Sequence, residues 1–461
     1  MSSLPAILFV ICIMAALLSG FPVAFALVIT SLAYALLAAL FGVFDPVLLY
    51  AIPSRIYGVM TNQVLVAVPL FVLMGMVLQK SRLAEDMFGA VMTLFSRSTN
   101  GMMLSVTVVG VLLAASTGIV GASVVMLGLL GLPVLLRAGV PLQLASGGVA
   151  AAGTLGQIIP PSIVLIVLGD QMSNAYQVAQ TKAGNFAPQT VTVADLFAGA
   201  LVPGLLLAGL FVVYQLWRLR GVRSTPQEFA DADAGSPTNM LSALILPLGL
   251  ILAVLGSILT GVATPTEAAA LGALLSMFLG LIRERGTGFL MTAVAEAVHL
   301  TAMIFVIVIA ASIFALVFRG LGGDALVEGL VQAMPGGTYG ALLGVMLLIF
   351  VLGFFLEFLE ITYMVVPLVA PILLALPMAD GSAMSPVWLG VLIAINLQTS
   401  FMTPPFGVAL FYLRGVVPET VATTAIYCGV VPYIGLQMFA LGLVMVFPAL
   451  AQWLPDLLLG R

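Results

Sequence analysis

Charged and metal-binding side chains are scarce in this chain, and their scarcity excludes several classes of protein. Only 7% of the 461 residues are charged, 14 basic against 18 acidic, so nucleic acid has no basic stripe to bind. There is one histidine, His299, and the two cysteines, Cys12 and Cys428, lie far apart in apolar sequence. These are too few ligands for a disulfide or zinc framework, so we expect both thiols to be inert and buried.

Motifs of the common enzyme chemistries are also missing. The chain has no G-x-S-x-G, no H-E-x-x-H and no Walker-type G-x-x-x-x-G-K-[ST]. Two acidic residues, Glu357 and Glu360, occur in one apolar segment, whereas an aspartyl protease needs two facing acids. We therefore predict that the protein is not an enzyme.

Apolar sequence, by contrast, is abundant. Hydrophobic residues make up 62% of the chain, and apolar segments long enough to cross a bilayer recur from end to end. The first segment has no basic region before it and no A-x-A-like break after Gly20, so we expect a membrane helix and not a removed signal peptide. The predicted fold class is an all-α polytopic membrane protein in contact with the lipid bilayer.

Two of the apolar stretches contain a Pro-Pro pair preceded by small polar residues. GTLGQIIPPS covers residues 153–162, and NLQTSFMTPP covers residues 396–405. Each proline removes a backbone donor, and lipid tolerates a broken turn only where it lines a cavity walled by protein. Paired broken helices in two halves of a chain indicate the binding site of a secondary transporter.

An internal repeat relates the two stretches. Pro161 and Pro405 are separated by 244 residues (405 − 161 = 244), and Lys80 and Arg319 by a similar interval (319 − 80 = 239). We predict four parts: a first inverted repeat (1–168), a connecting loop, helix and cytoplasmic linker (169–240), a second inverted repeat (241–413) and a C-terminal transmembrane helix (414–461).

Basic residues indicate that the repeats are inverted. Most of them follow the third helix of the first half, the linking helix, or the second helix of the second half: Lys80, Arg82, Arg97, Arg218, Arg220, Arg223, Arg283 and Arg285. The positive-inside rule makes these positions cytoplasmic, so corresponding helices of the two halves point in opposite directions. Arg55 and Arg319 depart from this pattern.

Each repeat contains a helical hairpin with a polar tip. In residues 101–136 the tip is STGIVGAS, and in residues 342–376 it is EFLEIT. The apolar flanks of the first hairpin look too short to cross about 30 Å of hydrocarbon, so we expect re-entrant hairpins whose tips meet the broken helices near the midplane. Glu360 is favoured over Glu357 because it lies nearer Thr362.

The tips and the broken helices supply the candidate binding residues. Freed carbonyls and side-chain oxygens suit Na⁺, and exposed N–H groups suit a carboxylate. The candidates for binding substrate or Na⁺ are Ser116, Thr117, Gly118, Gly121, Ala122, Ser123, Gly153, Thr154, Gly156, Pro160, Pro161, Glu360, Thr362, Asn396, Gln398, Thr399, Thr403, Pro404 and Pro405. The alternative for any single Ser, Thr or Gly is a packing role between helices.

Three other residues have simpler explanations. Arg414 could pair with a carboxylate, but at the end of a helix it is expected to reach the membrane surface. Glu267 should cap the helix that follows Pro265. The lone His299 follows an amphipathic stretch, residues 289–298, that we interpret as an interfacial arm.

At these residues the chain resembles the large membrane subunit of the tripartite ATP-independent periplasmic (TRAP) transporters. The matching segments are GFPVAFAL (20–27), VPLFVLMG (68–75), AAAGTLGQIIPPSIVLIVLGD (150–170), GVATPTEAAALGA (261–273) and NLQTSFMTPPFGVALFYLRG (396–415). The resemblance implies an elevator-type fold in the bacterial inner membrane and coupling to Na⁺. It also implies a small four-helix membrane subunit and a periplasmic binding protein that delivers an organic acid, usually a carboxylate.

The chain departs from this family in two places. Residues 171–194 form a longer and more polar loop than the family needs, and Glu357 and Glu360 make the second hairpin more acidic than in many members. We therefore predict a Na⁺-driven import subunit with one Na⁺ in each half, near Ser116 and Gly153 and near Glu360 and Thr399. The alternatives are a stand-alone Na⁺/dicarboxylate carrier and an ion channel, which would need a continuous polar pore.

Overall fold

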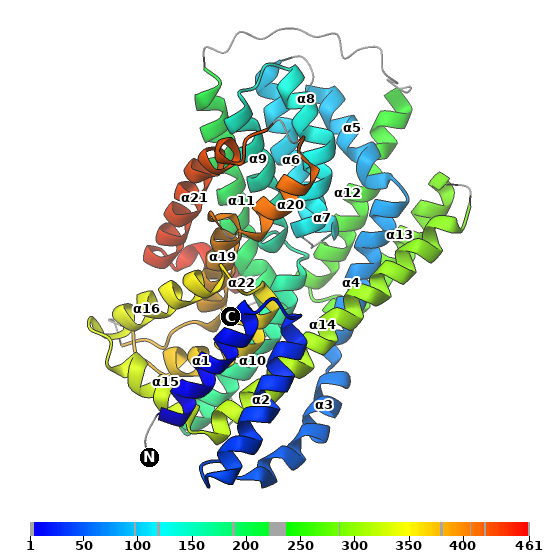
Figure 1. Cartoon of the computed structure of the whole chain (residues 1–461). Coiled ribbons are helices and arrows are strands. Elements are labelled where there is room, and N and C mark those ends of the chain that lie inside the picture. Colours follow the sequence, from blue (N-terminus) through cyan, green and yellow to red (C-terminus); the bar gives the residue numbers. More distant parts are fainter. Residues whose placement is uncertain are drawn as a thin grey trace. The chain divides into compact units, whose positions relative to one another are not determined.

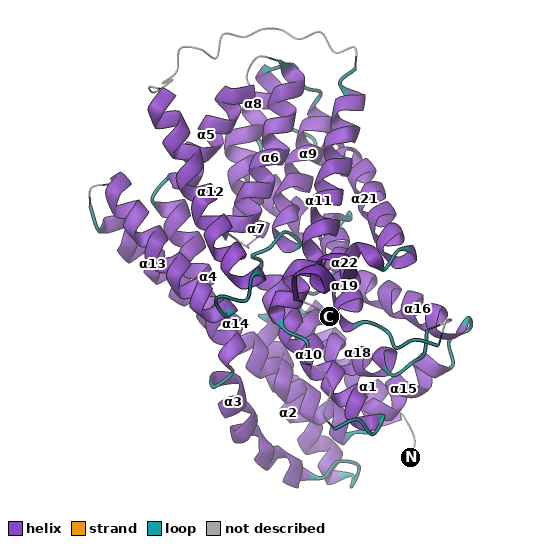
Figure 2. Ribbon diagram, turned by 180° about the vertical axis from the view of Figure 1, so that it is seen from behind, coloured by secondary structure: helices purple, strands orange, loops and turns teal. Residues whose placement is uncertain are grey.

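The structure, a computed structural model, describes residues 4–95, 98–117, 120–186, 190–220, 237–284, 286–378, 381–405, 407–418 and 421–459. Regular structure in these ranges is helical, apart from one isolated bridge between Pro377 and Ala383 (Figure 2). The predicted all-α fold class is confirmed.

Seven helical runs in the described residues are long and apolar enough to cross a membrane. They are α2 (Val23–Leu40), α4 (Gln63–Lys80), the run of α7 (Val120–Met126), η2 (Leu127–Gly131) and α8 (Leu132–Arg137), α11 (Val193–Arg218), α13 (Pro265–Glu284), α14 (Gly288–Gly320) and α21 (Thr423–Val446). The predicted polytopic membrane protein has the helices that it requires.

The described residues also form helices that are not among these seven runs. They are α1 (Leu4–Leu18), η1 (Pro46–Ala51), α3 (Ile52–Met60), α5 (Leu83–Phe95), α6 (Thr99–Thr117), α9 (Leu142–Thr154), η3 (Leu155–Gln157), α10 (Ile163–Lys182), α12 (Pro237–Leu259), α15 (Gly323–Gln332), α16 (Gly337–Leu352), α17 (Phe358–Glu360), η5 (Ile361–Val365), α18 (Val366–Leu374), α19 (Pro386–Met402), α20 (Val408–Val416) and α22 (Ala449–Leu459). The predicted arm over residues 289–298 is the first part of the 33-residue helix α14.

The chain forms two compact units, each built from segments of both sequence halves. The first unit contains Met1–Leu65, Val167–Thr192 and His299–Leu389, and the second contains Val66–Ile166, Val193–Val298 and Gly390–Arg461. The boundaries of the two repeats are a matter of sequence and stay a prediction.

Small residues allow close packing in the second unit, where α6, α9, α11 and α21 lie side by side (Figure 1). Gly147 of α9 and Gly429 of α21 lie so close to the opposite helix that a Cβ on either would overlap its backbone. The buried ring of Tyr433 makes edge contacts with Phe211 and Tyr214, each at a centroid distance of 5.2 Å. Small residues at such crossings are the usual means by which membrane helices pack.

Aromatic packing joins α1, α2 and α14 in the first unit. Phe9 stacks on Phe314 at 5.4 Å and lies 5.2 Å from the ring of Tyr34, whose hydroxyl donates to the Pro5 carbonyl oxygen at 2.8 Å. Gly320 near the end of α14 accommodates the ring of Phe44, which a Cβ there would overlap. These contacts hold the first two helices against the last part of α14.

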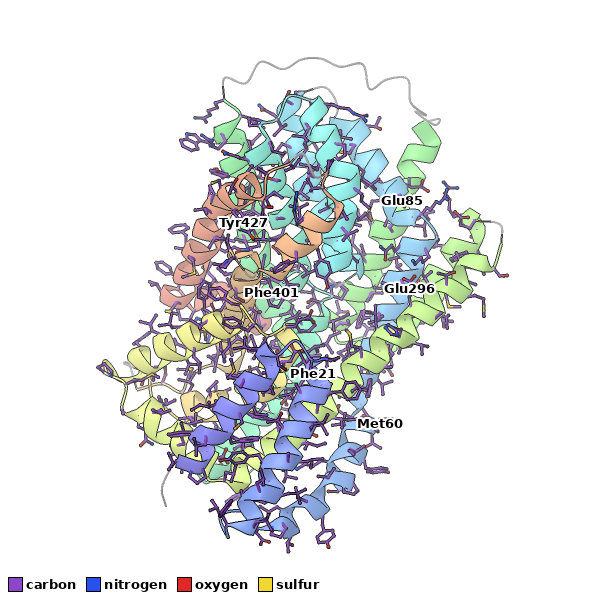
Figure 3. All side chains as sticks on the ribbon, in the orientation of Figure 1. Phe21, Met60, Glu85, Glu296, Phe401 and Tyr427 are labelled. Carbon is purple, nitrogen blue, oxygen red and sulfur yellow. The ribbon has the colours of Figure 1, made fainter. Side chains whose placement is uncertain are left out.

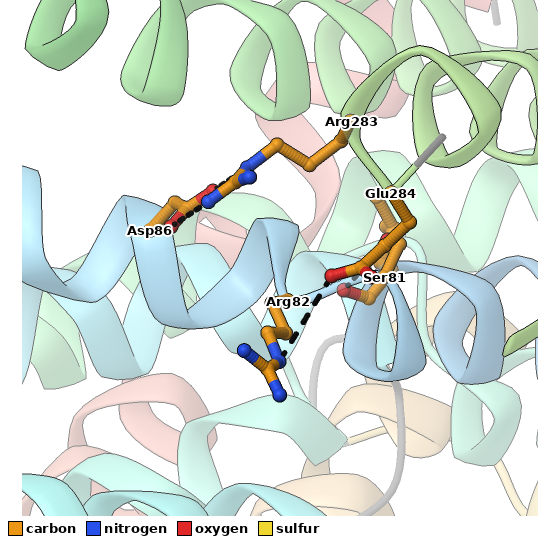
Figure 4. A network of polar contacts seen from close by, with 6 residues as sticks. Ser81, Arg82, Asp86, Arg283 and Glu284 are labelled. Carbon is orange, nitrogen blue, oxygen red and sulfur yellow. Dashed lines mark hydrogen bonds and ion pairs between the residues drawn. The ribbon is translucent and has the colours of Figure 1, made fainter. Parts of the chain in front are cut away.

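Ion pairs fix the start of α5 to the end of α13 within the second unit (Figure 4). Arg283 donates to both carboxylate oxygens of Asp86, at 2.5 and 3.1 Å, and Arg82 Nε lies 3.9 Å from Glu284 Oε1. The Lys80 ammonium reaches Glu296 at 2.6 Å. These side chains are partly exposed, so each pair contributes at most about 1 kcal/mol to stability.

The cap predicted for α13 is confirmed. The Glu267 carboxylate accepts from the Thr264 backbone N–H at 2.8 Å, and the Thr264 hydroxyl oxygen accepts from the Glu267 N–H at 3.3 Å. This reciprocal arrangement satisfies N–H groups that the first helical turn would otherwise leave without partners. Glu267 is therefore a capping residue.

The prediction that residues 171–194 form a polar loop is wrong for more than half of these residues. Helix α10 continues to Lys182, and α11 begins at Val193. Gln, Ala and Lys are good helix formers, so a polar segment rich in them extends a helix where polarity alone suggested a loop.

Two other expectations also fail. The flanks of the first hairpin are longer than the sequence predicts, because helix continues almost to the tip. Helix α6 has 19 residues, and the α7–α8 run has 18 residues and qualifies as a membrane span. The cysteines are free but exposed. Apolar sequence in a membrane protein also covers its lipid-facing surface, where large side chains such as Phe21 and Met60 (Figure 3) are 69% and 58% exposed.

Candidate functional site

The first broken helix is buried along its whole unwound turn. Helix α9 ends at Thr154, the short turn η3 follows, and α10 begins at Ile163 after a cis Pro160–Pro161 bond. The Ser162 hydroxyl donates to the Gln157 carbonyl oxygen at 2.8 Å. Every residue from Gly153 to Ser162, Gly156 included, is buried, so the break lies inside the protein and not at a surface.

Gln157 lies at the centre of this turn and was missed as a candidate. Its side chain is fully buried, yet neither its amide oxygen nor its amide nitrogen has a hydrogen-bond partner among the described residues. An amide left unpaired in a protein interior costs about 1–3 kcal/mol. The signal in the sequence was that Gln157 is the one amide side chain within GTLGQIIPPS.

The second broken helix repeats the pattern. Helix α19 ends at Met402, and α20 begins at Val408 after a cis Pro404–Pro405 bond. The hydroxyls of Thr399 and Thr403 each donate to the carbonyl oxygen four residues earlier, at 2.8 Å. Because each hydroxyl gives its proton to its own helix, its oxygen keeps lone pairs for a cation or another donor.

One hydrogen bond joins the two broken helices. The Gln398 amide nitrogen donates to the Thr154 hydroxyl oxygen at 3.3 Å, and both side chains are fully buried. These two residues are 244 apart in sequence, which is the interval that aligns the two Pro-Pro pairs. If the predicted repeats are related by a two-fold axis, equivalent positions would touch only near that axis, so the location of this contact is consistent with the predicted repeat.

Polar and sulfur groups surround this contact. The Thr154 hydroxyl donates to the Ala151 carbonyl oxygen at 2.8 Å and also lies 3.3 Å from the Met402 sulfur. The Gln437 amide nitrogen approaches the same sulfur to 3.3 Å, while the amide oxygen of Gln398 has no partner in the described chain. A buried acceptor at the junction of the breaks is therefore free to bind a ligand.

The first hairpin packs against the first break. A Cβ at Gly153 would lie 2.5 Å from Val124 Cγ2 and 2.9 Å from Val124 Cα, and a Cβ at Gly121 would lie 2.8 Å from the Tyr412 ring. Ser123 is buried and Ala122 is half-buried. Gly118 and the side chains of Ser116 and Thr117 lie outside the described residues.

The tip of the second hairpin carries the buried acid favoured by the sequence. Glu360 and Thr362 are 1% and 0% exposed, and Glu360 Oε2 and Thr362 Oγ1 have no partners in the described part of the chain. Both belong to the first compact unit, whereas Thr154, Asn396 and Gln398 belong to the second. The meeting of the two tips at one site stays a prediction.

Two residues that the sequence analysis considered, Arg414 and His299, lie outside the site. The Arg414 guanidinium donates to the Val421 carbonyl oxygen at 2.7 Å, so it fixes the turn after α20. His299 is exposed on α14.

The chain is similar to known proteins over most of its length. The family model described as "Tripartite ATP-independent periplasmic transporter, DctM component" matches residues 10–450. The C4-dicarboxylate TRAP transporter large permease protein DctM of Rhodobacter capsulatus is 27% identical over 391 residues, 84% of this chain and 86% of the relative. The sialic acid TRAP transporter large permease protein SiaM of Vibrio cholerae is 27% identical over 451 residues, 96% of this chain and 97% of the relative.

A solved structure shares the fold. The YdaH transporter of Alcanivorax borkumensis, whose crystal structure is described as having an unusual topology, superposes with a TM-score of 0.61. The match covers 97% of this chain and 99% of the other at 17% sequence identity.

Proposed function

Because the chain belongs to the tripartite ATP-independent periplasmic transporter family as its DctM component, we propose that it imports an organic acid by coupling to Na⁺. Members of this family are multi-pass proteins of the bacterial inner membrane. Two of its relatives are named for C4-dicarboxylates and for sialic acid, which are carboxylates. The observation that supports a transport site is the buried contact between Thr154 and Gln398, which joins two broken helices.

The ion sites would use neutral oxygen ligands. Na⁺ prefers hard ligands, and the unwound turns after Thr154 and after Met402 free backbone carbonyls beside hydroxyls that already donate their protons. We assign one ion to the region of Ser116 and Gly153, and one to the region of Glu360 and Thr399. The unpaired amide of Gln157 and the unpaired amide oxygen of Gln398 are buried polar groups that would be available to a bound ligand.

The transport cycle would be of the elevator type. The hairpins and broken helices would move as one body against a scaffold made of the first two helices of each half and the arms. A cycle of this kind exposes one buried site alternately to the two sides of the membrane. Driving it with a Na⁺ gradient requires that substrate and ion occupy the moving body together.

The family description implies a three-component system. In this proposal the chain works with a small four-helix membrane subunit and with a periplasmic binding protein that delivers the acid. The binding protein would set much of the specificity, so the permease site needs to recognise chiefly the carboxylate group that the substrates share.

Uptake into proteoliposomes tests the proposal. The full chain would be reconstituted with and without its small subunit and binding protein, and the uptake of labelled carboxylates measured with and without an inward Na⁺ gradient. We expect uptake only with the gradient and with both partners. Uptake by the chain alone would establish the stand-alone carrier, and non-saturable flux without a gradient would establish a channel.

A further inference from the structure

A cavity of about 340 Å³ lies within the first compact unit, and none of its lining residues belongs to either broken turn. Residues of α3, α10, α14 and the η5–α18 segment line this cavity, which is partly open to the surface. Small residues keep the space open where larger ones would fill it, among them Gly58, Ala175 and Ala315. Small side chains on neighbouring helices leave unfilled space between the helices where they do not interdigitate.

Two arginines line this cavity, and they are the two that depart from the positive-inside pattern. Arg55 comes from α3 and Arg319 from α14. Burial, and next the like charge of Arg319, lower the pKa of Arg55, which lies outside the candidate spans. Two cations therefore line one partly open cavity, where Arg55 is half-buried and Arg319 is exposed.

The carboxylates nearby leave guanidinium donors without an ion-pair partner among the described residues. No carboxylate lies within 4 Å of Arg55 among the described residues, and Arg319 Nε lies 3.6 Å from Asp324 Oδ1 in a pair that is about half exposed. Asp170 also lines the cavity, but its two oxygens accept from the amides of Asn62, at 3.1 Å, and Gln171, at 2.9 Å. The acid is thus already hydrogen-bonded, and the guanidinium donors remain available.

Neutral polar groups complete the lining. Asn174 and Ser312 face the cavity, and Tyr363 does so from the second hairpin, one helical turn beyond Glu360. The Tyr363 hydroxyl is buried without a partner in the described chain. Guanidinium groups are the preferred partners of carboxylates, and hydroxyl and amide groups orient the rest of a polar ligand.

We propose that this cavity is a second binding site for small organic acids, in which Arg55 and Arg319 hold the carboxylate. That the acid is of the transported class rests on the proposed function. A site of this kind gives the acid a place in the first unit that does not require Na⁺, since its positive charge comes from the protein. Its dependence on the two arginines, and not on the broken helices, separates it from the transport site.

Binding to the purified full-length chain in Na⁺-free choline chloride tests the proposal by calorimetry. The probes are succinate, L-malate, gluconate and inorganic phosphate. We expect at least one of the three acids to bind, and the Arg55→Gln/Arg319→Gln variant to bind it at least about tenfold more weakly, because two charge-assisted contacts are lost. Arg220→Gln, which removes an exposed arginine elsewhere, should bind as the wild type does.

Several outcomes would overturn the site. These are no binding of any acid, equal binding by the double variant, or phosphate binding more tightly than every acid, which would indicate a phosphate or lipid headgroup site. Because the assay contains no Na⁺, its result is independent of whether uptake is coupled to Na⁺. A failure of the proposed function would leave this binding unchanged.

A second measurement needs no choice of ligand. Asn174→Cys in a Cys12→Ser/Cys428→Ser background places one thiol on the cavity wall. We expect an anionic methanethiosulfonate reagent to react faster than a cationic one, and the acids to slow both. The preference should disappear when Arg55 and Arg319 are replaced by Gln, and equal rates before that replacement would contradict a positively charged site.

Discussion

The Gln398 amide has two distinct tasks at the junction of the broken helices. Its nitrogen donates to Thr154, and its oxygen has no partner in the described chain. We predict that Gln398→Ala lowers Na⁺-dependent uptake at least about tenfold and the free energy of unfolding by about 1–3 kcal/mol, because a buried polar partner is lost. Uptake kinetics and thermal unfolding in detergent would measure the two effects.

Gln437→Ala is the matched control for this variant. Gln437 is another fully buried glutamine, and its amide contacts only the Met402 sulfur. It should destabilise the chain to a similar extent while the apparent KM for Na⁺ stays unchanged. If both variants lose uptake in parallel with stability, Gln398 has a structural role only.

Gln157 offers the opposite test, since its side chain has no partner to lose. Both polar atoms of its amide are buried and unpaired among the described residues. Methionine has a similar shape and no such cost, so we predict that Gln157→Met is as stable as the wild type or more stable, by up to about 1–3 kcal/mol. The same variant should lose uptake, and retained uptake would show that no ligand uses this amide.

At the scale of elements, the first hairpin and the first break are held by a glycine contact. A Cβ at Gly153 would come within 2.9 Å of the Val124 backbone, so the hairpin has to shift. We predict that Gly153→Ala reduces uptake severalfold. Gly209→Ala on α11, where nothing lies within 4 Å, should instead stabilise the helix by about 0.5–1 kcal/mol and leave uptake intact. Equal behaviour of the two variants would contradict a packing constraint at Gly153.

Sequence reasoning located the elements that local chemistry determines and erred where burial depends on partners. The Pro-Pro pairs predicted both helix breaks, and the residues around Pro265 predicted the cap at Glu267. The loop expected after Gln171 is largely helix, because helix propensity there outweighs polarity. Cys12 and Cys428 were expected to be buried, but hydropathy does not distinguish a protein core from a lipid-facing surface.

For the whole molecule, contacts between residues that are distant in sequence were the hardest to predict. The sequence aligned the two Pro-Pro pairs, but only packing shows that Thr154 and Gln398, which lie at the same interval, touch each other. Arg55 and Arg319 stood out in sequence as exceptions to the charge pattern, and their shared cavity follows from the fold. The positive-inside rule therefore identified Arg55 and Arg319 as unusual, but it gave no reason for their positions.

The predicted inverted arrangement of the repeats can be tested by the sidedness of two equivalent positions. Glu85 and Asp324 are separated by the interval that relates Lys80 to Arg319 (324 − 85 = 239), and both lie in the first turn of the helix that follows, α5 or α15. Both side chains are exposed, and Figure 3 labels Glu85 on α5. In an inverted repeat, equivalent positions lie on opposite faces of the membrane.

We predict that Asp324→Cys reacts with a membrane-impermeant maleimide in intact spheroplasts, whereas Glu85→Cys reacts only after permeabilisation. Both variants would be made in the Cys12→Ser/Cys428→Ser background, because the native thiols are exposed. Arg220→Cys, at the end of α11, serves as the cytoplasmic reference that the positive-inside rule assigns. Labelling of both test positions from the same side would show that the repeats are parallel. Two parallel halves could not exchange conformations so as to present one buried site alternately to the two sides of the membrane.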